Sequence, residues 1–438
     1  MNTRRDFIIE HALLLLRWLL TSALLSVTVG SASALFLWLL DLATKTQQSS
    51  PYWLWSLPFW GAISAWLYLS SGREAGQGNN LVIAEIQHPM KGLPWFMAPL
   101  IVLATILTHL GGGSAGREGT AVQMGAGLAG IWARWTKPWL GEDYREILLM
   151  GVAAGFGGVF GTPVAGAIFA AEVLSVGRLP TSAILPCLLA SCGADFVCTT
   201  VGGTHLHYPV DWAELNSSGW LHRLGIVGLI ILLGAVAGLV AKGFSEGLHL
   251  AGHWYARFLP DPIRRITIGS LVVVFVAEFV VGRDYLGLGT TNLNPHAVTI
   301  GSCFRAGGAH DWSWLCKLLL TILTLACGLK GGEVTPLFFI GAALGNVLAV
   351  KTGLLPVDVA AALGFVAVFS AATNAPLASS VLAIELFGPD RIEYVFAACF
   401  SAWLVAGGSS IYSTQHPGWG KMLKENAGNH PLDTKTST

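Results

Sequence analysis

The chain has 438 residues, of which 53% are hydrophobic and 11% are charged, and its mean hydropathy is +0.61. These values exclude an ordinary soluble domain and indicate a polytopic membrane protein. Lys and Arg together number 25, as do Asp and Glu, so the formal net charge is zero and no nucleic-acid-binding surface is expected. The seven cysteines form no CxxC motif and are expected to be buried free thiols.

The first apolar segment, 11–44, is long enough for a tilted membrane-spanning helix. Arg4 and Arg5 precede it and no convincing cleavage site follows, so we expect an uncleaved first span with a cytoplasmic N-terminus. A second apolar run, 51–69, is rich in Trp, which is typical of a membrane interface.

Residues 71–85 begin with a polar, glycine-rich stretch that does not suit a lipid-facing helix. We expect a broken helix there, which presents a short polar set to an interior cavity. The members of this set are Gln77, Gly78, Asn79 and Asn80.

The stretch 111–128, GGGSAGREGTAVQMGAGL, connects the apolar runs 94–110 and 121–132 and predicts a helix that begins at a glycine-lined bend. The first N–H groups of a helix have no intrahelical partner and form its positive end. Within a membrane such groups must be buried in protein or line a wet cavity, so this bend marks a site. The carboxylate of Glu118 lies at this positive end, where it replaces a bound anion when ionised and frees the place when protonated.

The rest of the chain continues as short apolar segments. A charged turn is expected between Arg134 and Arg145, and a polar loop carries His205, His207, Asp211 and Glu214. The apolar segments lie at 147–174, with a break at 161–163, at 184–200, and, in a second half that begins near His222, at 224–240, 266–281, 315–329, 336–350, 360–372, 376–387 and 395–406. Many are shorter than the roughly 20 residues of a full span. Short segments with glycine breaks, such as Gly331 and Gly332, predict a transporter core.

An internal repeat is visible when the chain is aligned with itself. At the offset of 213 that takes Gly151 to Gly364, the Gly, Ala, Phe, Pro and Glu positions of one segment recur in the other, and Glu172 meets Glu385. At an offset of 215, Glu118 meets Glu333. The chain is therefore predicted to be a duplicated unit.

We expect the first repeat in 1–210, the second in 211–418 and a short polar tail in 419–438, with no cytoplasmic regulatory domain. Parallel and inverted copies are both compatible with the hydropathy. An inverted pair is favoured because it brings both glycine-lined helix starts to the midplane, where their dipoles act together on one anion.

These motifs resemble the CLC family of chloride channels and anion/proton exchangers over nearly the whole length. The family's GREGP signature is matched by Gly116 to Thr120, with Thr120 in the proline place. Its GxFxP signature is matched by 332–336, with Val334 replacing the usual phenylalanine, and its anion-coordinating tyrosine is matched by Tyr412. The family's GSGIP segment is here Gly76 to Asn80, in which Gln77 takes the place of a serine or methionine.

Three substitutions resemble the fluoride-exporting branch of this family. They are GNN in place of GIP, the acidic Glu333, and the apolar Val173 at the inner proton-glutamate position, next to Glu172. The resemblance implies an all-helical CLC fold of two inverted repeats and a fluoride/proton antiporter rather than an enzyme. It also implies a homodimer with one pathway per subunit in a cell inner membrane, both termini cytoplasmic, and no cofactor or metal.

Glu118 is expected to gate the pathway and carry the proton, and Glu333 to pass the proton on. Fluoride is small and strongly hydrated, so a dry site must return several hydrogen bonds to it. Backbone N–H groups, amides and hydroxyls near Glu118 can supply them. The expected anion-binding residues are Gln77, Gly78, Asn79, Asn80, Gly116, Gly119, Thr120, Val334, Thr335 and Tyr412.

Each of these roles has a structural alternative. Glu118 could form a salt bridge with Arg117, and Glu333 could be a solvated loop carboxylate. Asn79 and Asn80 could cap the following helix, and Tyr412 could belong to an interfacial aromatic belt.

For Glu172 and Glu385, capping or structural pairing is favoured over transport. The His205 and His207 pair has no third spaced metal ligand, so a solvated loop is favoured.

Rival functions are a chloride or nitrate/proton exchanger and a passive channel of the same family. An intramembrane enzyme has little support because HExxH and paired-aspartate motifs are missing from the sequence. His109, near the glycine run, is expected to pack or to line the pathway.

Overall fold

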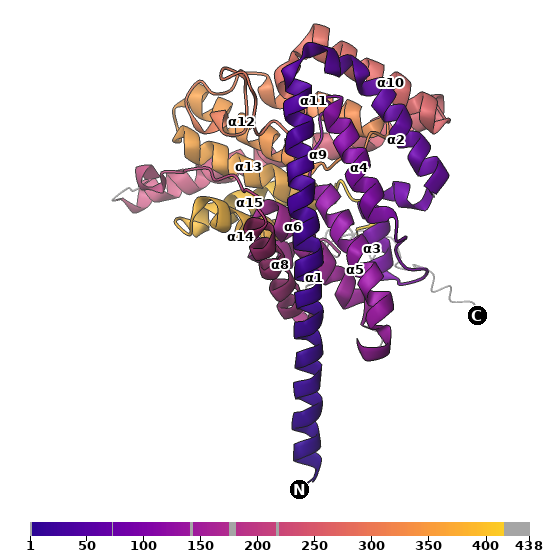
Figure 1. Ribbon diagram of the computed structural model, residues 1–438. Coiled ribbons are helices and arrows are strands. Elements are labelled where there is room, and N and C mark those ends of the chain that lie inside the picture. Colours follow the sequence, from indigo (N-terminus) through magenta and orange to yellow (C-terminus); the bar gives the residue numbers. More distant parts are fainter. Residues whose placement is uncertain (1, 72, 141–142, 175–180, 216–218, 416–438) are drawn as a thin grey trace, which may run out of the picture.

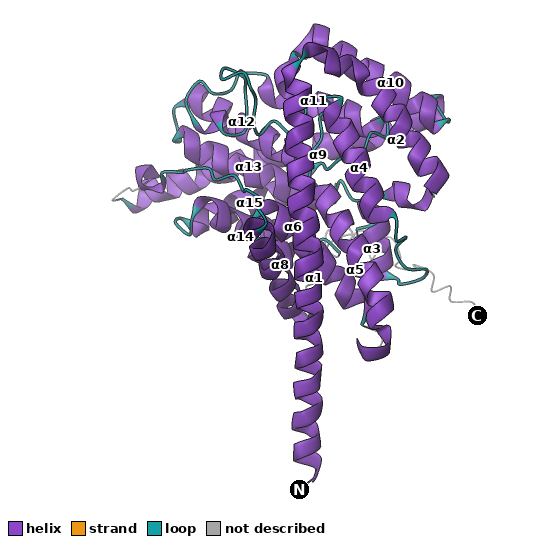
Figure 2. Cartoon of the chain, viewed as in Figure 1, coloured by secondary structure: helices purple, strands orange, loops and turns teal. Residues whose placement is uncertain are grey.

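The computed structural model describes residues 2–71, 73–140, 143–174, 181–215 and 219–415. These residues are almost entirely helical (Figures 1 and 2). Their β-type pairing is limited to one isolated antiparallel bridge, between Gly116 and Gly332. The predicted all-helical fold is confirmed.

The first half of the chain opens with a long helix that extends well beyond its neighbours at the N-terminal end (Figure 1). Its elements are α1 Asn2–Ser49, η1 Pro51–Ser56, α2 Leu57–Ser71, η2 Arg73–Gln77, α3 Asn79–Gln87, α4 Met97–Leu110, α5 Glu118–Leu140, α6 Tyr144–Phe160, α7 Pro163–Glu172, α8 Thr181–Thr200 and η3 Trp212–Leu215.

The second half repeats this order of long and short helices. Its elements are α9 Trp220–Phe258, α10 Pro262–Val276, the π-turn η4 Ala277–Val281, η5 Arg283–Tyr285, η6 Ser302–Phe304, α11 Ser313–Ala326, α12 Val334–Thr352, α13 Val357–Thr373, α14 Pro376–Phe387 and α15 Ile392–Ala406.

Several predicted boundaries were wrong. The charged turn begins later than expected because α5 continues to Leu140, and α9 continues beyond Val240 to Phe258. The predicted single run 51–69 is divided into η1 and α2, and 266–281 ends in a π-turn. The broken helix predicted in 71–85 is present as η2 and α3.

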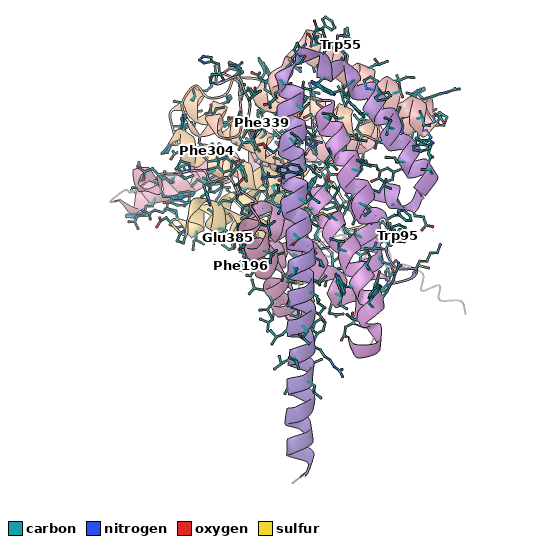
Figure 3. All side chains as sticks on the ribbon, in the orientation of Figure 1. Trp55, Trp95, Phe196, Phe304, Phe339 and Glu385 are labelled. Carbon is teal, nitrogen blue, oxygen red and sulfur yellow. The ribbon has the colours of Figure 1, made fainter. Side chains whose placement is uncertain are left out.

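Four helices of the described chain are long and apolar enough to cross a membrane. They are α8, α9, α12 and the part of α1 from Ala12 to Ser49. Large hydrophobic side chains are exposed on the surface, among them Trp55, Trp95 and Phe196 (Figure 3). Such exposure is expected of a surface that faces lipid.

The duplication is also a duplication of helix packing. Helices α5 and α6 pack together as α12 and α13 do, and α6 packs on α8 as α13 packs on α15. Glycines allow both close contacts: a methyl group on Gly125 would lie 2.1 Å from the carbonyl oxygen of Gly151, and one on Gly341 would lie 2.2 Å from that of Gly364. The helices therefore approach until their backbones touch.

Two helices also pack against their own counterparts, since α2 contacts α10 and α7 contacts α14. An element can touch its own copy only near the axis that relates the two copies. Both pairs therefore lie near the axis that relates the two repeats.

The free cysteines differ in part from the sequence prediction. Cys187, Cys198, Cys303, Cys327 and Cys399 are buried thiols, as predicted. Cys192 is exposed and Cys316 is half-buried, because each lies on an outer face of its helix.

Candidate functional site

The two glycine-rich loops meet inside the molecule. The Gly116 N–H donates to the Gly332 carbonyl at 2.5 Å, and the Gly332 N–H donates to the Gly116 carbonyl at 2.8 Å. Helices α5 and α12 both begin two residues after this bridge, at Glu118 and Val334. Their N-termini therefore lie together, and N–H groups without intrahelical partners converge on one point.

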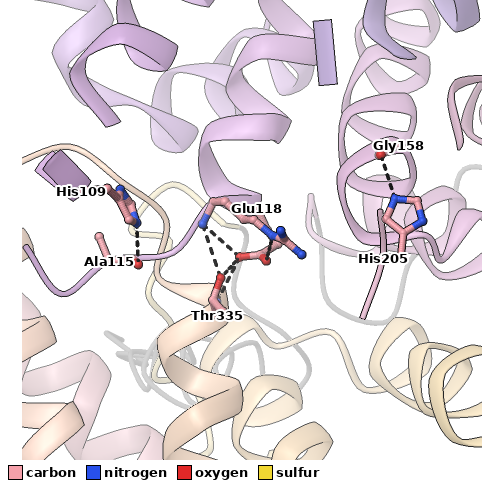
Figure 4. A network of polar contacts seen from close by, with 7 residues as sticks. His109, Ala115, Glu118, Gly158, His205 and Thr335 are labelled. Atoms are coloured by element: carbon pink, nitrogen blue, oxygen red, sulfur yellow. Dashed lines mark hydrogen bonds and ion pairs between the residues drawn. The ribbon is translucent and has the colours of Figure 1, made fainter. Parts of the chain in front are cut away.

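Glu118 lies at this point and is only 1% exposed. Its Oε2 accepts hydrogen bonds from the Thr335 N–H at 3.1 Å, from the Thr335 hydroxyl and from the Arg117 N–H at 3.2 Å (Figure 4). Its Oε1 lies 3.4 Å from Nε of Arg117 and accepts no hydrogen bond. The carboxylate thus occupies the first-turn donors of α12, which is where an anion would bind, in addition to its ion pair with Arg117.

Glu333 follows Gly332 in the second glycine-rich loop, and its side chain faces the first loop. A methyl group on Gly119 would lie 3.2 Å from Oε2 of Glu333 and 3.1 Å from Nδ2 of Asn79, so both side chains face Gly119. Oε2 of Glu333 and Oδ1 of Asn79 are buried and have no hydrogen-bond partner in the described structure. Buried polar atoms without protein partners are rare, and these two atoms are available to interact with an ion, a water molecule or a proton.

Asn80 connects this region to the loop of Tyr412. Its Oδ1 accepts from the Thr414 hydroxyl at 3.1 Å and from the Thr414 N–H at 3.3 Å. Tyr412 is buried and lies close enough to Glu333 and Glu118 to interact electrostatically with both. Neither asparagine caps α3 with its side chain, since Gly78 is the N-cap and makes no such bond.

Gly78 has a positive φ of 61°, a conformation that favours glycine. A methyl group there would lie 3.3 Å from both terminal atoms of the Gln123 side chain. Gln123 is buried, and its Oε1 has no partner in the described structure. Gln123 was not predicted from the sequence, although its position one helical turn after Gly119, in an apolar helix, was a usable signal.

The remaining predicted anion ligands are placed differently. The Thr120 hydroxyl lies 2.7 Å from the Thr105 hydroxyl, so that side chain faces α4. Val334 is buried as the first residue of α12, and Gln77 is exposed. Within the described residues, most of the predicted site lies around the two helix starts. The residues there are Glu118, Glu333, Gly116, Gly119, Thr335, Asn79 and Tyr412, and Gly78 and Asn80 adjoin them.

A small cavity of about 20 Å³ lies beside Glu118 and Arg117. Tyr208, Phe338 and Phe365 line it, and the rings of Phe338 and Phe365 stack with centroids 3.9 Å apart. This volume holds about one water-sized particle. The cavity leaves room for a side-chain rotation of Glu118 or for one small ion.

Glu172 and Glu385 do not face this site. Glu172 accepts from the Leu377 and Ala378 N–H groups at 3.0 and 2.7 Å, at the start of α14. Glu385 accepts from the Val164 and Ala165 N–H groups at 2.9 and 2.8 Å, at the start of α7. The predicted capping and structural pairing are confirmed. Val173 directly after Glu172 is buried.

The histidines are held by backbone carbonyls. His109 is buried, and its Nδ1 lies 2.8 Å from the Thr105 carbonyl. Its Nε2 lies 3.0 Å from the Ala115 carbonyl (Figure 4), so it anchors the glycine loop to α4. His205 lies 3.3 Å from the Gly158 carbonyl and 3.5 Å from Asp195. Burial lowers the pKa of His205, and the Asp195 carboxylate opposes this shift. The described residues contain no group of three His, Cys, Asp or Glu side chains that could hold a metal.

The fold and the site define a class of protein: a helical membrane protein of two repeats, built like a secondary transporter, whose broken helices place a carboxylate between two helix N-termini. Residues 60–407 match the voltage gated chloride channel family, and the chain belongs to this family, the CLC family. The family resemblance inferred from the sequence is confirmed.

Relatives in this family include the chloride/fluoride channel protein of Pseudomonas syringae pv. tomato. It is 40% identical over 411 residues, which cover 92% of this chain and 87% of the relative. The crystal structure of a CLC-type fluoride/proton antiporter is similar with a TM-score of 0.85 and 33% identity, over 92% of this chain and 98% of that one. A slow cyanobacterial Cl⁻/H⁺ antiporter shares the fold, with a TM-score of 0.76 and 20% identity, over 94% and 99% of the two chains.

Proposed function

We propose that the chain exports fluoride in exchange for protons and that Glu118 is the group shared by the two ions. The observation that carries this proposal is that the Glu118 carboxylate accepts hydrogen bonds from the N–H and hydroxyl of Thr335, in the first turn of α12. The similarity to a fluoride/proton antiporter and to a chloride/fluoride channel protein supports the choice of ion. We further propose a homodimer in a bacterial inner membrane with both termini in the cytoplasm.

The exchange follows from competition for these donors. An ionised Glu118 accepts from the Thr335 N–H and hydroxyl, so an anion at the same place must displace it. A protonated carboxyl accepts more weakly from these groups and is free to leave. The small cavity beside Glu118 supplies room for that movement. Anion and proton occupancy are then linked through one side chain.

Glu333 is the second proton-handling group in this proposal. Its Oε2, which has no hydrogen-bond partner in the described structure, faces Gly119 together with the Asn79 amide. A carboxyl group there can take a proton from one side of the site and pass it toward Glu118. Lys330, three residues earlier in the same loop, interacts electrostatically with Glu333.

The donor set suits a small, hard anion. The Thr335 hydroxyl, the first-turn N–H groups of α5 and α12 and the Asn79 amide are all hydrogen-bond donors within one buried region. Fluoride loses a large hydration energy on entering a dry site, and a dense set of donors compensates it best.

The test is transport by the purified chain in liposomes. Vesicles with equal fluoride concentrations inside and outside, placed in an inward proton gradient, should expel fluoride until the outside concentration exceeds the inside one, followed with a fluoride electrode. Glu118→Gln should abolish this proton-driven movement, whereas Glu246→Gln, on an exposed part of α9, should not. Proton-driven movement of chloride or nitrate in place of fluoride would support the rival exchangers. Fluoride flux that ignores the proton gradient would indicate a channel.

A further inference from the structure

A second cavity, of about 510 Å³, lies away from the aromatic cavity at Glu118. It is bounded by α2, by η2, by the start of α10 and by the loop that precedes α12. Gln77 and Asp261 line it and are exposed, so this cavity, which we call the vestibule, opens to solvent. Because Gly76 and Gln77 also line it, the vestibule reaches the polar loop that leads to Asn79.

Lys330 contributes one positive charge to the vestibule. Its Nζ donates to the Gly76 carbonyl at 2.9 Å and lies 4.6 Å from the centroid of the Tyr68 ring. One carbonyl uses one of the three ammonium protons, so the group retains donors for a further ligand. Lys330 also stands in the loop that carries Gly332 and Glu333, and its charge interacts with Glu333.

Arg265 contributes a second charge. It lines the vestibule, and its buried Nε has no hydrogen-bond partner in the described structure. Its guanidinium lies near the Lys330 loop, because a methyl group on Gly328 would be 3.7 Å from Nη2 of Arg265. Two like charges near each other are costly unless an anion is present.

The carboxylate among the lining residues, Asp261, does not offset these charges by a salt bridge. Its Oδ1 accepts from the Arg264 backbone N–H at 2.8 Å and caps α10. The vestibule therefore has more positive than negative charge, and the buried Nε of Arg265 is a donor available to an anion.

We propose that the vestibule is a collecting site for a small monovalent anion, held by Lys330 and Arg265 before it moves past Gln77 to the Glu118 site. The inference rests on the proposed function, which makes fluoride the ion collected. A cleft with charge of one sign raises the local concentration of the opposite ion and so lowers the concentration needed for half-maximal transport.

Lys330 also has a structural part to play, because it ties the Gly76 carbonyl to the second repeat. Arg265 separates the two effects, since its Nε makes no such bond. Arg264 is a matched control: it is adjacent on α10, exposed and outside the vestibule lining, and its capping bond uses only its backbone.

The experiment measures initial rates of proton-driven fluoride transport in liposomes against fluoride concentration. Arg265→Gln and Lys330→Gln should raise KM about five- to tenfold with a smaller change in the maximal rate, and Lys330→Arg should restore KM. High concentrations of an impermeant salt should raise the wild-type KM toward that of the variants. Arg264→Gln should leave KM unchanged.

An unchanged KM in Arg265→Gln, or equal effects of Arg264→Gln and Arg265→Gln, would overturn the collecting site. If wild-type protein moves chloride but not fluoride, the proposed function fails while the vestibule is tested by the same variants with chloride. In that case a raised chloride KM supports the collecting site and an unchanged one overturns it. A chain that carries neither halide overturns both.

Discussion

Glu172 and Glu385 each cap the helix that carries the other. Glu172, at the end of α7, accepts from two N–H groups at the start of α14, and Glu385, near the end of α14, accepts from two N–H groups at the start of α7. Pro163 and Pro376 begin these helices at equivalent positions of the repeat. This reciprocal capping gives a hydrogen-bond acceptor to first-turn N–H groups that would otherwise have none, at both ends of an antiparallel helix pair.

This reciprocal capping predicts that variants of the two glutamates lose stability but still transport fluoride. Glu172→Gln keeps the shape but has one acceptor oxygen where the carboxylate has two, so one of the two N–H groups loses its partner and faces the amide NH2, which should cost about 1–3 kcal/mol. Glu385→Gln should cost less, because Glu385 is partly exposed and Glu172 is 3% exposed. Thermal unfolding in detergent should show both decreases. Fluoride transport per folded molecule should stay near wild type, and a stable variant that transports poorly would contradict the structural role.

The Thr335 hydroxyl predicts a second result. It donates to Glu118, and in the proposed mechanism it donates to the anion once Glu118 leaves. Thr335→Val keeps the volume and the N–H but removes this donor, so fluoride transport should fall about tenfold. Thr335→Ser restores the donor and should restore most of the rate. Equal rates in the Val and Ser variants would show that the hydroxyl does not contact the ion.

Close backbone approach at the glycine loop predicts a third result. A methyl group on Gly119 would lie 3.0 Å from Cα of Gly332 and close to Asn79 and Glu333, and one on Gly116 would lie 2.9 Å from the backbone N of Thr335. Gly116→Ala and Gly119→Ala should therefore separate the two helix starts and abolish transport, measured as fluoride efflux. Gly228→Ala in α9 is the control, because its methyl group meets nothing within 4 Å. Wild-type efflux by Gly119→Ala would show that the loops need not touch.

Much of the site could be predicted from local chemistry. The run from Gly116 to Glu118 before an apolar segment defines a helix start with a carboxylate, and the structure has α5 begin there. For Glu172 and Glu385, capping or structural pairing was favoured over transport because they match each other in the repeat and each closes an apolar helix. Each of these inferences needs only the sequence near the residue, or its copy.

What could not be predicted depends on contacts across the two repeats. The bond from Thr335 to Glu118 joins residues far apart in the chain and is set by how α5 and α12 meet. Gln123 and Lys330 were missed because a single polar residue in an apolar stretch has many structural explanations. The last half of α9 was missed because its polar residues interrupt the apolar run, although the helix continues to Phe258.

Glu333 gives the sharpest test of proton transfer. Its Oε2 is buried beside Gly119 and the Asn79 amide and has no hydrogen-bond partner among the described residues. If it passes protons toward Glu118, Glu333→Gln should leave the Thr335 donors and the Glu118 seat intact but reduce proton-driven fluoride movement at least tenfold. The fluoride electrode and a pH dye in the same liposomes measure both ions.

Glu246→Gln, on the exposed face of α9, is the control for loss of a carboxylate as such. Wild-type coupling in Glu333→Gln would mean that Glu333 has only a structural role and that protons reach Glu118 by another route. Loss of coupling with fluoride flux retained would place the proton path, but not the anion path, through this side chain.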